Sequence, residues 1–235
     1  MATWSSALAA HLVPARVLER REAESGGKLG TGMAAVDDVL GGGWPRGALS
    51  ELAGPRGSGR TTLLCLAIAQ ALAAGEAAAL IDVGGGLDPR WAQTLGVPLE
   101  RLLWVRCHDS QALPAADLVL SAGGFGLLAI DFGDLPVRVP TAAWQRLKRT
   151  ATVQRTAVVL SSPFRPQGLQ ARVGLRLDPG RPVFRAHPEA SPLLLEVHTR
   201  LHLERAVQGA GLDPANTFRP LPLAWPRHPP HQVAA

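Results

Sequence analysis

A short stretch rich in glycine and hydroxyl-bearing residues is the part of the chain best suited to hold phosphate. It reads Gly54-Pro55-Arg56-Gly57-Ser58-Gly59-Arg60-Thr61-Thr62. An apolar run typical of a strand (49–53) precedes it, and an apolar run typical of a helix (63–74) follows it. Glycines let backbone N–H groups turn toward phosphate oxygens, and a helix start adds unpaired N–H groups. This order is that of a P-loop, GxxxxGK[ST], so we expect it to bind the phosphates of a nucleotide.

One position departs from the P-loop pattern, because Arg60 stands where the pattern has lysine. Lysine brings a compact charge to the terminal phosphates, whereas a guanidinium group is larger, planar and forked. Two outcomes are open from the sequence. Either Arg60 holds a phosphate in a different way, or it folds into the empty loop, blocks it and leaves the loop only as an element of the fold.

Two residues are candidates for a magnesium site beside this loop. Thr61 stands where the hydroxyl group of a P-loop contacts phosphate-bound Mg²⁺. Asp131 ends a buried apolar run, 125–131, that is typical of a strand. A carboxylate at the carboxyl end of a strand beside a P-loop holds Mg²⁺ in such proteins. We therefore expect Thr61 and Asp131 to lie together.

Short apolar runs alternate with helical patterns through the middle of the chain. The strand-like runs are 49–53, 77–83, 102–107, 125–131 and 157–163, and the helical ones are 63–74, 87–95 and 144–155. This alternation predicts an α/β fold with a mainly parallel sheet flanked by helices. Later runs at 173–177, 183–186 and 193–199 alternate as strands do, and they predict a small antiparallel extension.

Composition divides the chain into three parts. Residues 1–29 are predicted to form an N-terminal helical arm and linker, residues 30–208 the core, and residues 209–235 a proline-rich, flexible tail. Within the tail, the apolar patch 221–225 has two open interpretations. It docks on a partner, or it folds back on its own domain.

The overall composition favours a globular cytoplasmic protein. The chain has 235 residues, 46% hydrophobic content, a net charge of +5 and two cysteines. The sequence has no run of eighteen or more apolar residues, so we expect no membrane span, and we expect no signal peptide. Two cysteines do not suggest a disulfide framework.

Positive charge is concentrated in the second half of the chain. Between residues 135 and 188 many basic residues are accompanied by a single acid, Asp178. Such a concentration suits contact with a nucleic-acid backbone, and a nucleoid-associated location would follow. The candidates are Arg138, Arg146, Lys148, Arg149, Arg165 and Arg172. The alternatives are a solvated face and a face that meets an acidic protein partner.

Two long stretches resemble the core of the RecA recombinases. Residues 31–62 resemble that family's approach to its ATP loop, and residues 79–107 resemble the segment that carries its adenine contacts. The resemblance covers roughly residues 31–200 and implies binding of ATP or ADP with Mg²⁺. It implies that Asp88 contacts the adenine amino group and that Trp91 stacks on the base, the alternative being that Trp91 is a core residue.

The chain also departs from the RecA pattern at positions that serve catalysis. Where the family has the glutamate that orients the attacking water, this chain has Gly84, and Asp82 should face away. Where the family has a phosphate-sensing glutamine, it has Ser162 and Pro163. Together with Arg60, these changes predict weak ATP hydrolysis at most. Asp134 lies near enough in sequence to be considered as a substitute base.

The pattern of losses is similar to that of the ImuA group, RecA-like accessory proteins of bacterial mutagenesis cassettes. This similarity implies a part in SOS-induced translesion synthesis beside an ImuB-like polymerase relative and a replicative-type polymerase. RecA and single-stranded DNA are further expected partners. The alternative function is an active DNA-dependent ATPase, of the RecA or KaiC-like kind, in DNA repair or recombination.

Overall fold

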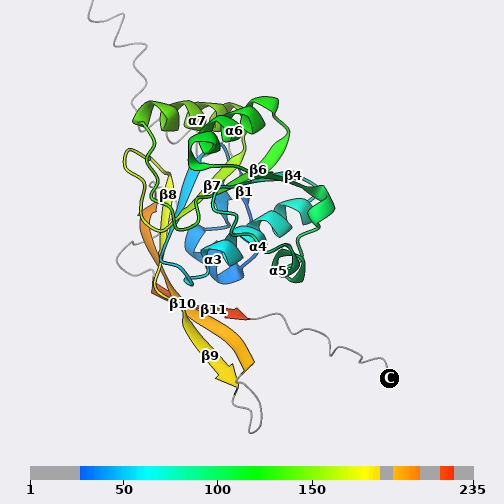
Figure 1. Cartoon of the computed structure of the whole chain (residues 1–235), viewed down its shortest axis with the longest axis vertical. Helices are drawn as coiled ribbons and strands as arrows, with labels where there is room; N and C mark the ends of the chain where they lie inside the picture. Colours follow the sequence, from blue (N-terminus) through cyan, green and yellow to red (C-terminus); the bar gives the residue numbers. More distant parts are fainter. Residues whose placement is uncertain (1–26, 186–192, 207–217, 225–235) are drawn as a thin grey trace, which may run out of the picture.

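The computed structural model describes residues 27–185, 193–206 and 218–224 (Figure 1). The predicted N-terminal helix and much of the predicted tail lie outside the described residues. The boundaries of the three predicted parts therefore stay predictions.

A sheet of nine strands runs through the described residues in the order β11-β10-β8-β3-β7-β6-β4-β5, with β9 paired to β10. The strands are β3 Leu49–Ala53, β4 Ala77–Asp82, β5 Leu102–Arg106, β6 Phe125–Asp131, β7 Ala157–Ser162, β8 Val173–Leu177, β9 Arg181–Arg185, β10 Leu193–Ala206 and β11 Phe218–Ala224. Six neighbouring strands of the sheet, β8-β3-β7-β6-β4-β5, are parallel to one another. The three pairs that β10 makes, with β8, β9 and β11, are antiparallel. A separate antiparallel pair joins β1 Lys28–Leu29 to β2 Trp44–Pro45. The predicted α/β fold with an antiparallel extension is confirmed.

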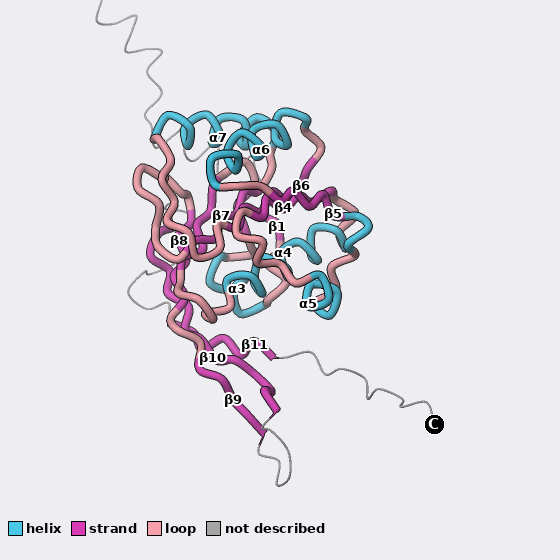
Figure 2. Tube along the Cα trace, viewed as in Figure 1, coloured by secondary structure: helices cyan, strands magenta, loops and turns pink. Residues whose placement is uncertain are grey.

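Helices cover both faces of the parallel part of the sheet (Figures 1 and 2). They are α3 Ala34–Leu40, α4 Arg60–Ala73, α5 Pro89–Thr94, α6 Asp109–Ala122 and α7 Thr141–Gln154, with a 3₁₀ turn at Leu99–Arg101. Alternate side chains of each strand enter different cores, because successive residues of a strand point to opposite faces. Thus Leu80 packs in the cluster that contains α4, while Ile81 packs in the cluster that contains α6 and α7.

The carboxyl ends of the parallel strands meet at one edge of the sheet. The P-loop leaves β3 at this edge, and Asp131 of β6 is in register with Asp82 of β4 and Ser161 of β7. Residues far apart in the sequence are therefore brought to the same place. In an open α/β sheet, this edge is where ligands bind.

The antiparallel extension is larger than the sequence predicted. β10 continues to Ala206 because its first half pairs with β9 and its second half with β8. Residues 218–224 of the predicted flexible tail form β11, paired with β10, so for this segment the prediction was wrong. Pro220 and Pro222 lie in an edge strand, the place in a sheet where proline is found, because there its nitrogen can face away from the neighbouring strand.

In the part of the chain that the structure describes, no helix is long and apolar enough to cross a bilayer.

Candidate functional site

The P-loop has the backbone conformation of a phosphate cradle. Gly57 and Gly59 have φ values of 74° and 96°, in the left-handed region that glycine adopts most easily. A Cβ atom on Gly54 would lie 2.7 Å from Ser58 Oγ and 2.9 Å from Leu177 O, so only glycine fits there. The first turn of α4 has no side-chain cap, and its N–H groups have no partner within the helix. These groups are available to an anion.

A cavity of about 770 Å³ opens over this loop. The P-loop, the turn after β4 and the turn after β6 supply most of its wall. Trp91 of α5 and Val197 of β10 also line it. The cavity therefore joins the parallel sheet, one flanking helix and the antiparallel extension.

Thr61 and Asp131 lie side by side on the wall of this cavity. Thr61 Oγ1 donates to Asp131 Oδ2 at 3.3 Å, and the Gly133 amide donates to Asp131 Oδ1 at 3.0 Å. Burial raises the pKa of Asp131, against the hydrogen bonds from Gly133 and Ser161 and the charge of Arg60. The structure thus brings together the hydroxyl and the carboxylate that the sequence suggested for Mg²⁺.

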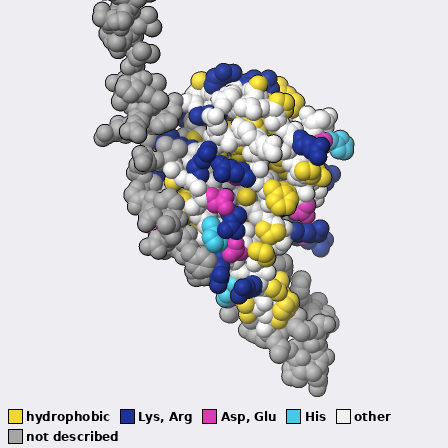
Figure 3. Space-filling view, turned by 90° about the vertical axis from the view of Figure 1, so that its left-hand side faces the viewer, with side chains coloured by type: hydrophobic (Ala, Val, Ile, Leu, Met, Phe, Trp, Pro, Cys, Tyr) yellow, Lys and Arg dark blue, Asp and Glu magenta, His cyan; other side chains and the backbone are white. Residues whose placement is uncertain are grey.

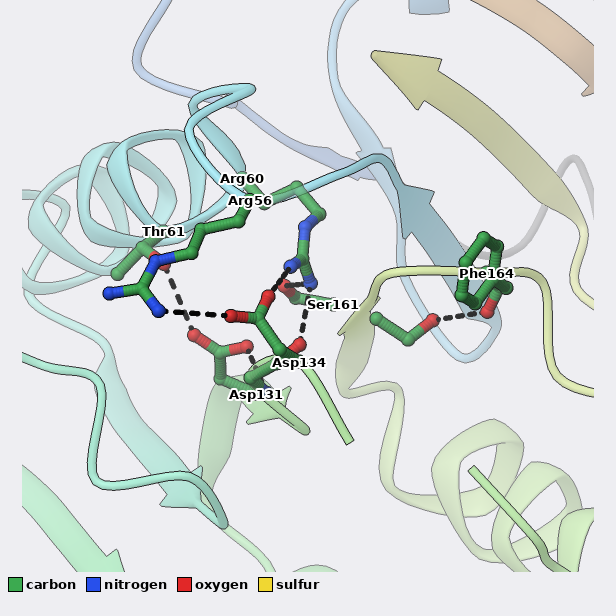
Figure 4. A network of polar contacts seen from close by, with 9 residues as sticks. Arg56, Arg60, Thr61, Asp131, Asp134, Ser161 and Phe164 are labelled. Atoms are coloured by element: carbon green, nitrogen blue, oxygen red, sulfur yellow. Dashed lines mark hydrogen bonds and ion pairs between the residues drawn. The ribbon is translucent and has the colours of Figure 1, made fainter. Parts of the chain in front are cut away.

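The side chain of Arg60 reaches across the carboxyl edge of the sheet and is bound to protein oxygens. Its Nη1 donates to Gly133 O at 3.1 Å and to Ser161 Oγ at 3.2 Å, and its Nη2 donates to Asp134 Oδ1 at 3.2 Å (Figure 4). Only 7% of the side chain is exposed. Burial lowers the pKa of Arg60, while the negative charges of Asp131 and Asp134 oppose that shift. The acceptors come from the ends of β6 and β7, so the guanidinium group is anchored outside the P-loop backbone.

Asp134 lies between two arginines of the P-loop. In addition to Arg60, its Oδ2 is 3.8 Å from Nη1 of Arg56, whose side chain is 91% exposed (Figure 4). The carboxylate that the sequence offered as a substitute base therefore faces the two arginines in this arrangement, although half of its side chain is exposed.

The turn after β4 shows what replaces the missing glutamate. Gly84, Gly85 and Gly86 line the cavity without side chains. A Cβ atom on Gly84 would lie 3.3 Å from Gly133 Cα, so a larger residue would require a small shift. Asp82 is buried and lies outside the lining. It accepts from the Gly86 amide at 3.1 Å and from Trp104 Nε1 at 3.1 Å, which fixes the turn.

The two residues suggested for adenine have different surroundings. Trp91 lines the cavity and is half-buried. Asp88 is exposed and caps the amino end of α5, accepting from the Arg90 amide at 2.8 Å and the Trp91 amide at 3.4 Å. Capping alone is sufficient reason for an aspartate at this position. The structure therefore brings Trp91, but not Asp88, to the cavity wall.

A second cavity, of about 590 Å³, lies between the segments 136–140 and 163–167. Four prolines and Phe164 line it, together with Arg138 and Arg165, two of the predicted DNA contacts. Lys and Arg side chains are spread over the face shown in Figure 3, from its top to its lower part, with acidic side chains among them. Arg165 is also tied inward, because its Nε is 3.4 Å from Oε2 of the buried Glu51.

The remaining predicted DNA contacts are spread over other parts of the surface. In α7, Arg146 and Arg149 are exposed and Lys148 is half-buried. Arg146 is paired with Asp117 of α6 at 3.1 Å. Arg172 lies at the opposite edge of the sheet from the P-loop, where its amide donates to Leu49 O. The six basic residues therefore do not form one compact patch.

Several residues of the site were missed in the sequence. Ser161 accepts a hydrogen bond from Arg60, whereas the sequence pattern singled out only the next two residues, Ser162 and Pro163. Val197 lines the cavity, and a Cβ atom on Gly180 would collide with Gly57 O of the P-loop. Val197 and Gly180 belong to the antiparallel extension and carry no local signal of contact with the loop.

Comparison with known proteins agrees with this geometry. Residues 16–166 match the family model described as the RecA N-terminal domain. Protein RecA of Mycolicibacterium vanbaalenii is 47% identical over 104 residues, which cover 43% of this chain and 29% of that protein. Protein RecA of Leifsonia xyli subsp. xyli is 41% identical over 138 residues, which cover 57% of this chain and 38% of that protein.

A solved structure shares the fold. The crystal structure of the RadB recombinase superposes with a TM-score of 0.58 and 22% identity, covering 77% of this chain and 90% of that one. The sequence matches thus span well under half the length of the RecA proteins, while the fold match spans most of the chain. Since the family model matches more than half of the sequence, the chain belongs to the RecA N-terminal domain family.

Proposed function

We propose that the chain binds an adenine nucleotide, ATP or ADP, with Mg²⁺ in the cavity over the P-loop. The observation that carries this proposal is the convergence of the glycine cradle, the Thr61–Asp131 pair and Trp91 on one cavity. The donor set fits the group, because a hydroxyl and a carboxylate are oxygen ligands suited to Mg²⁺. Ser58 Oγ is also buried without a hydrogen-bond partner among the described residues, which suits a loop that closes around an anion.

Each part of the cavity has a proposed task. The N–H groups of residues 57–62 hold phosphate oxygens, and Thr61 and Asp131 hold the metal. Trp91 stacks on the base, and Asp88, which lies outside the cavity lining at the start of α5, is proposed to reach the adenine amino group of the base stacked on Trp91. Bound Mg²⁺ would supply positive charge to the phosphates, in addition to that of Arg56 and Arg60 in the described lining of the cavity.

Hydrolysis is proposed to be slow or absent. Phosphoryl transfer depends on a group that positions water and on charges that stabilise the transition state. Gly84 offers no side chain for the first task, and Arg60 is bound to Gly133, Ser161 and Asp134. The cavity is therefore better suited to holding a nucleotide than to cutting one.

In the cell, we propose that the protein takes part in DNA repair as an accessory protein of SOS-induced translesion synthesis. We propose a cytoplasmic location, in association with the nucleoid. Membership of the RecA family supports the DNA-repair setting. The expected partners are an ImuB-like polymerase relative, a replicative-type polymerase, RecA and single-stranded DNA. The cavity with Arg138 and Arg165 is the surface we assign to DNA.

Titration with a fluorescent ATP analogue in the presence of Mg²⁺ tests nucleotide binding directly. We expect saturable binding that is weakened by Thr61→Ala and by Trp91→Ala. Steady-state hydrolysis with and without single-stranded DNA then separates the accessory role from its alternative, an active DNA-dependent ATPase. DNA-stimulated turnover of about 1 s⁻¹ or more, an ordinary enzyme rate, would favour the ATPase. Absence of nucleotide binding would contradict both.

Restoring the two altered positions tests the reason for slow hydrolysis. Arg60→Lys with Gly84→Glu should raise the hydrolysis rate, provided that Gly133 gives way to the new Cβ atom 3.3 Å from its Cα. Arg60→Lys with Gly86→Glu is the matched control, because a Cβ atom on Gly86 meets nothing within 4 Å and the carboxylate is displaced along the turn. Equal rates for the two pairs would show that Gly84 is not the limiting change.

DNA contact has its own test. Binding of single-stranded DNA should weaken steeply as salt concentration rises, because phosphate contacts release counterions. Arg138→Gln with Arg165→Gln should reduce both the affinity and the salt dependence. Binding that is insensitive to salt would argue against phosphate contacts on this surface.

A further inference from the structure

A carboxylate of the protein already holds the cationic side chains of the phosphate loop. Asp134 Oδ1 is 3.2 Å from Nη2 of the buried Arg60, and Asp134 Oδ2 is 3.8 Å from Nη1 of the exposed Arg56. Both oxygens of one carboxylate are thus directed at the two arginines of the loop (Figure 4). A phosphate group presents the same chemistry to arginine, namely anionic oxygens that accept from guanidinium.

The charged groups at the cavity balance one another without a ligand. Arg56 and Arg60 are cationic, whereas Asp131 and Asp134 are anionic, and all four line the cavity. An incoming polyphosphate therefore meets no net positive charge from these side chains. To gain the attraction of the two arginines, it must compete with Asp134, which is tethered to the same cavity wall.

Asp134 is free to leave the arginines, whereas Asp131 is not. The side chain of Asp134 is 51% exposed, and its hydrogen bond to Arg60 is the one that this carboxylate makes among the described side chains. Asp131 is buried and is fixed by Thr61 and by the Gly133 amide. Arg60 would keep its bonds to Gly133 O and Ser161 Oγ if Asp134 moved out.

From this geometry we infer that Asp134 is an internal competitor of phosphate, which sets the affinity of the cavity for polyphosphate ligands. When a ligand binds, its anionic oxygens replace the carboxylate at Arg56 and Arg60, and Asp134 turns toward solvent. The residue thus determines affinity through the arginines and takes no part in bond breaking. That the ligand is an adenine nucleotide rests on the proposed function. The competition between Asp134 and phosphate rests only on the geometry of Arg56, Arg60 and Asp134.

Asp134→Asn tests the competition, because it removes the charge and keeps the size of the side chain. Dissociation constants would be measured by titration with a fluorescent ATP analogue with Mg²⁺ and by calorimetry with inorganic tripolyphosphate. We expect both ligands to bind about tenfold more tightly to the variant, the change expected when a nearby repulsive and competing charge is lost. Asp134→Glu keeps the charge and should leave both affinities close to those of the natural chain.

Asp117→Asn is the matched control for net charge. Asp117 is also an aspartate paired with an arginine, Arg146 at 3.1 Å, but it lies on α6 away from the cavity. We expect it to leave both dissociation constants unchanged. If Asp117→Asn and Asp134→Asn lowered the dissociation constants equally, the effect would come from the net charge of the protein, and the inference would be overturned.

The remaining outcomes separate this inference from the proposed function. Tighter tripolyphosphate binding by Asp134→Asn without binding of the ATP analogue would support the competition and contradict the nucleotide assignment. Unchanged affinity for both ligands, with the natural chain binding ATP, would overturn the competition and leave the nucleotide assignment standing. If neither chain bound either ligand, both ideas would be wrong, because removal of the competitor should have opened the cavity.

Discussion

Two buried charged side chains, one just before the P-loop and one within it, have different surroundings. Glu51 lies in β3 before the loop and is 3% exposed, and Arg60 lies in the loop, at the start of α4, and is 7% exposed. Arg60 donates to three acceptors from the ends of β6 and β7. Glu51 has an ion pair at 3.4 Å with Arg165, and its Oε1 has no hydrogen-bond partner among the described residues.

The difference shows in the protonation of the two groups. Burial raises the pKa of Glu51 to about 7, against the charges of Arg165 and Arg205 and with that of Glu204. Burial lowers the pKa of Arg60, but a guanidinium group remains protonated in proteins, so Arg60 stays charged. The intrinsic basicity of guanidinium keeps Arg60 charged, and its three acceptors fix where that charge lies. The carboxylate of Glu51 has no such intrinsic margin, so burial brings it close to losing its charge at neutral pH.

Removal of the Arg60 guanidinium should have the largest effect on stability. Arg60→Met keeps most of the side-chain length but leaves Asp131 buried without its cationic neighbour. We expect the free energy of unfolding at pH 7 to fall by about 3 kcal/mol, as when one partner of a buried pair is removed. Denaturant unfolding monitored by circular dichroism would measure it.

Arg56→Met is the control for this variant, because Arg56 is 91% exposed and its ion pair with Asp134 is 3.8 Å long. An exposed pair of this kind contributes about 0.5 kcal/mol or less. If the two variants lost equal stability, the acceptors around Arg60 would not hold it more firmly than solvent does.

Glu51→Gln should have an intermediate effect, and of the opposite sign. Because the pKa of Glu51 is raised from 4.5 to about 7 on folding, the folded state binds its proton more tightly than the unfolded state. The associated stability is present below pH 4.5 and is lost as pH rises through 7. The glutamine variant avoids this loss, so at pH 8 it should be more stable than the natural chain by about 1–2 kcal/mol after loss of the Arg165 pair.

The pH dependence distinguishes this effect from a change in packing. The stability difference between Glu51→Gln and the natural chain should grow between pH 5 and pH 8 and be small at pH 5. Glu100→Gln, at an exposed position, should show no such trend. A difference that is constant with pH would mean that Glu51 does not titrate in this range.

Ser161→Ala should have a smaller effect than Arg60→Met, because Arg60 retains Gly133 O and Asp134 as acceptors. We expect a loss of about 1 kcal/mol in the free energy of unfolding, the usual contribution of a buried hydrogen bond. In the Arg60→Met background the loss should shrink, since the hydroxyl then has no guanidinium group to bind. Ser162→Ala, on the same strand but bonded to Phe164 O, should cost the same in both backgrounds.

A part of the fold follows from local patterns and was predicted well. β6 was predicted at residues 125–131 and found there, and α5, Pro89–Thr94, lies within the helical pattern predicted at 87–95. Apolar runs and helix caps act within a few residues, so the sequence alone carries them. The proximity of Thr61 and Asp131 also followed, because carboxyl ends of parallel strands share one edge.

The sequence by itself determined a glycine-rich loop between a strand and a helix, a glycine without a side chain at position 84 and the identity of Arg60. Only the tertiary structure decided that Arg60 binds Ser161 and Asp134, and that Glu51 lies buried beside Arg165. The physical reason is that each partner comes from a distant segment of the chain. The residues next to a charged side chain in the sequence do not reveal its ion-pair and hydrogen-bond partners. Those partners are set by the strand order of the sheet, which brings distant segments together.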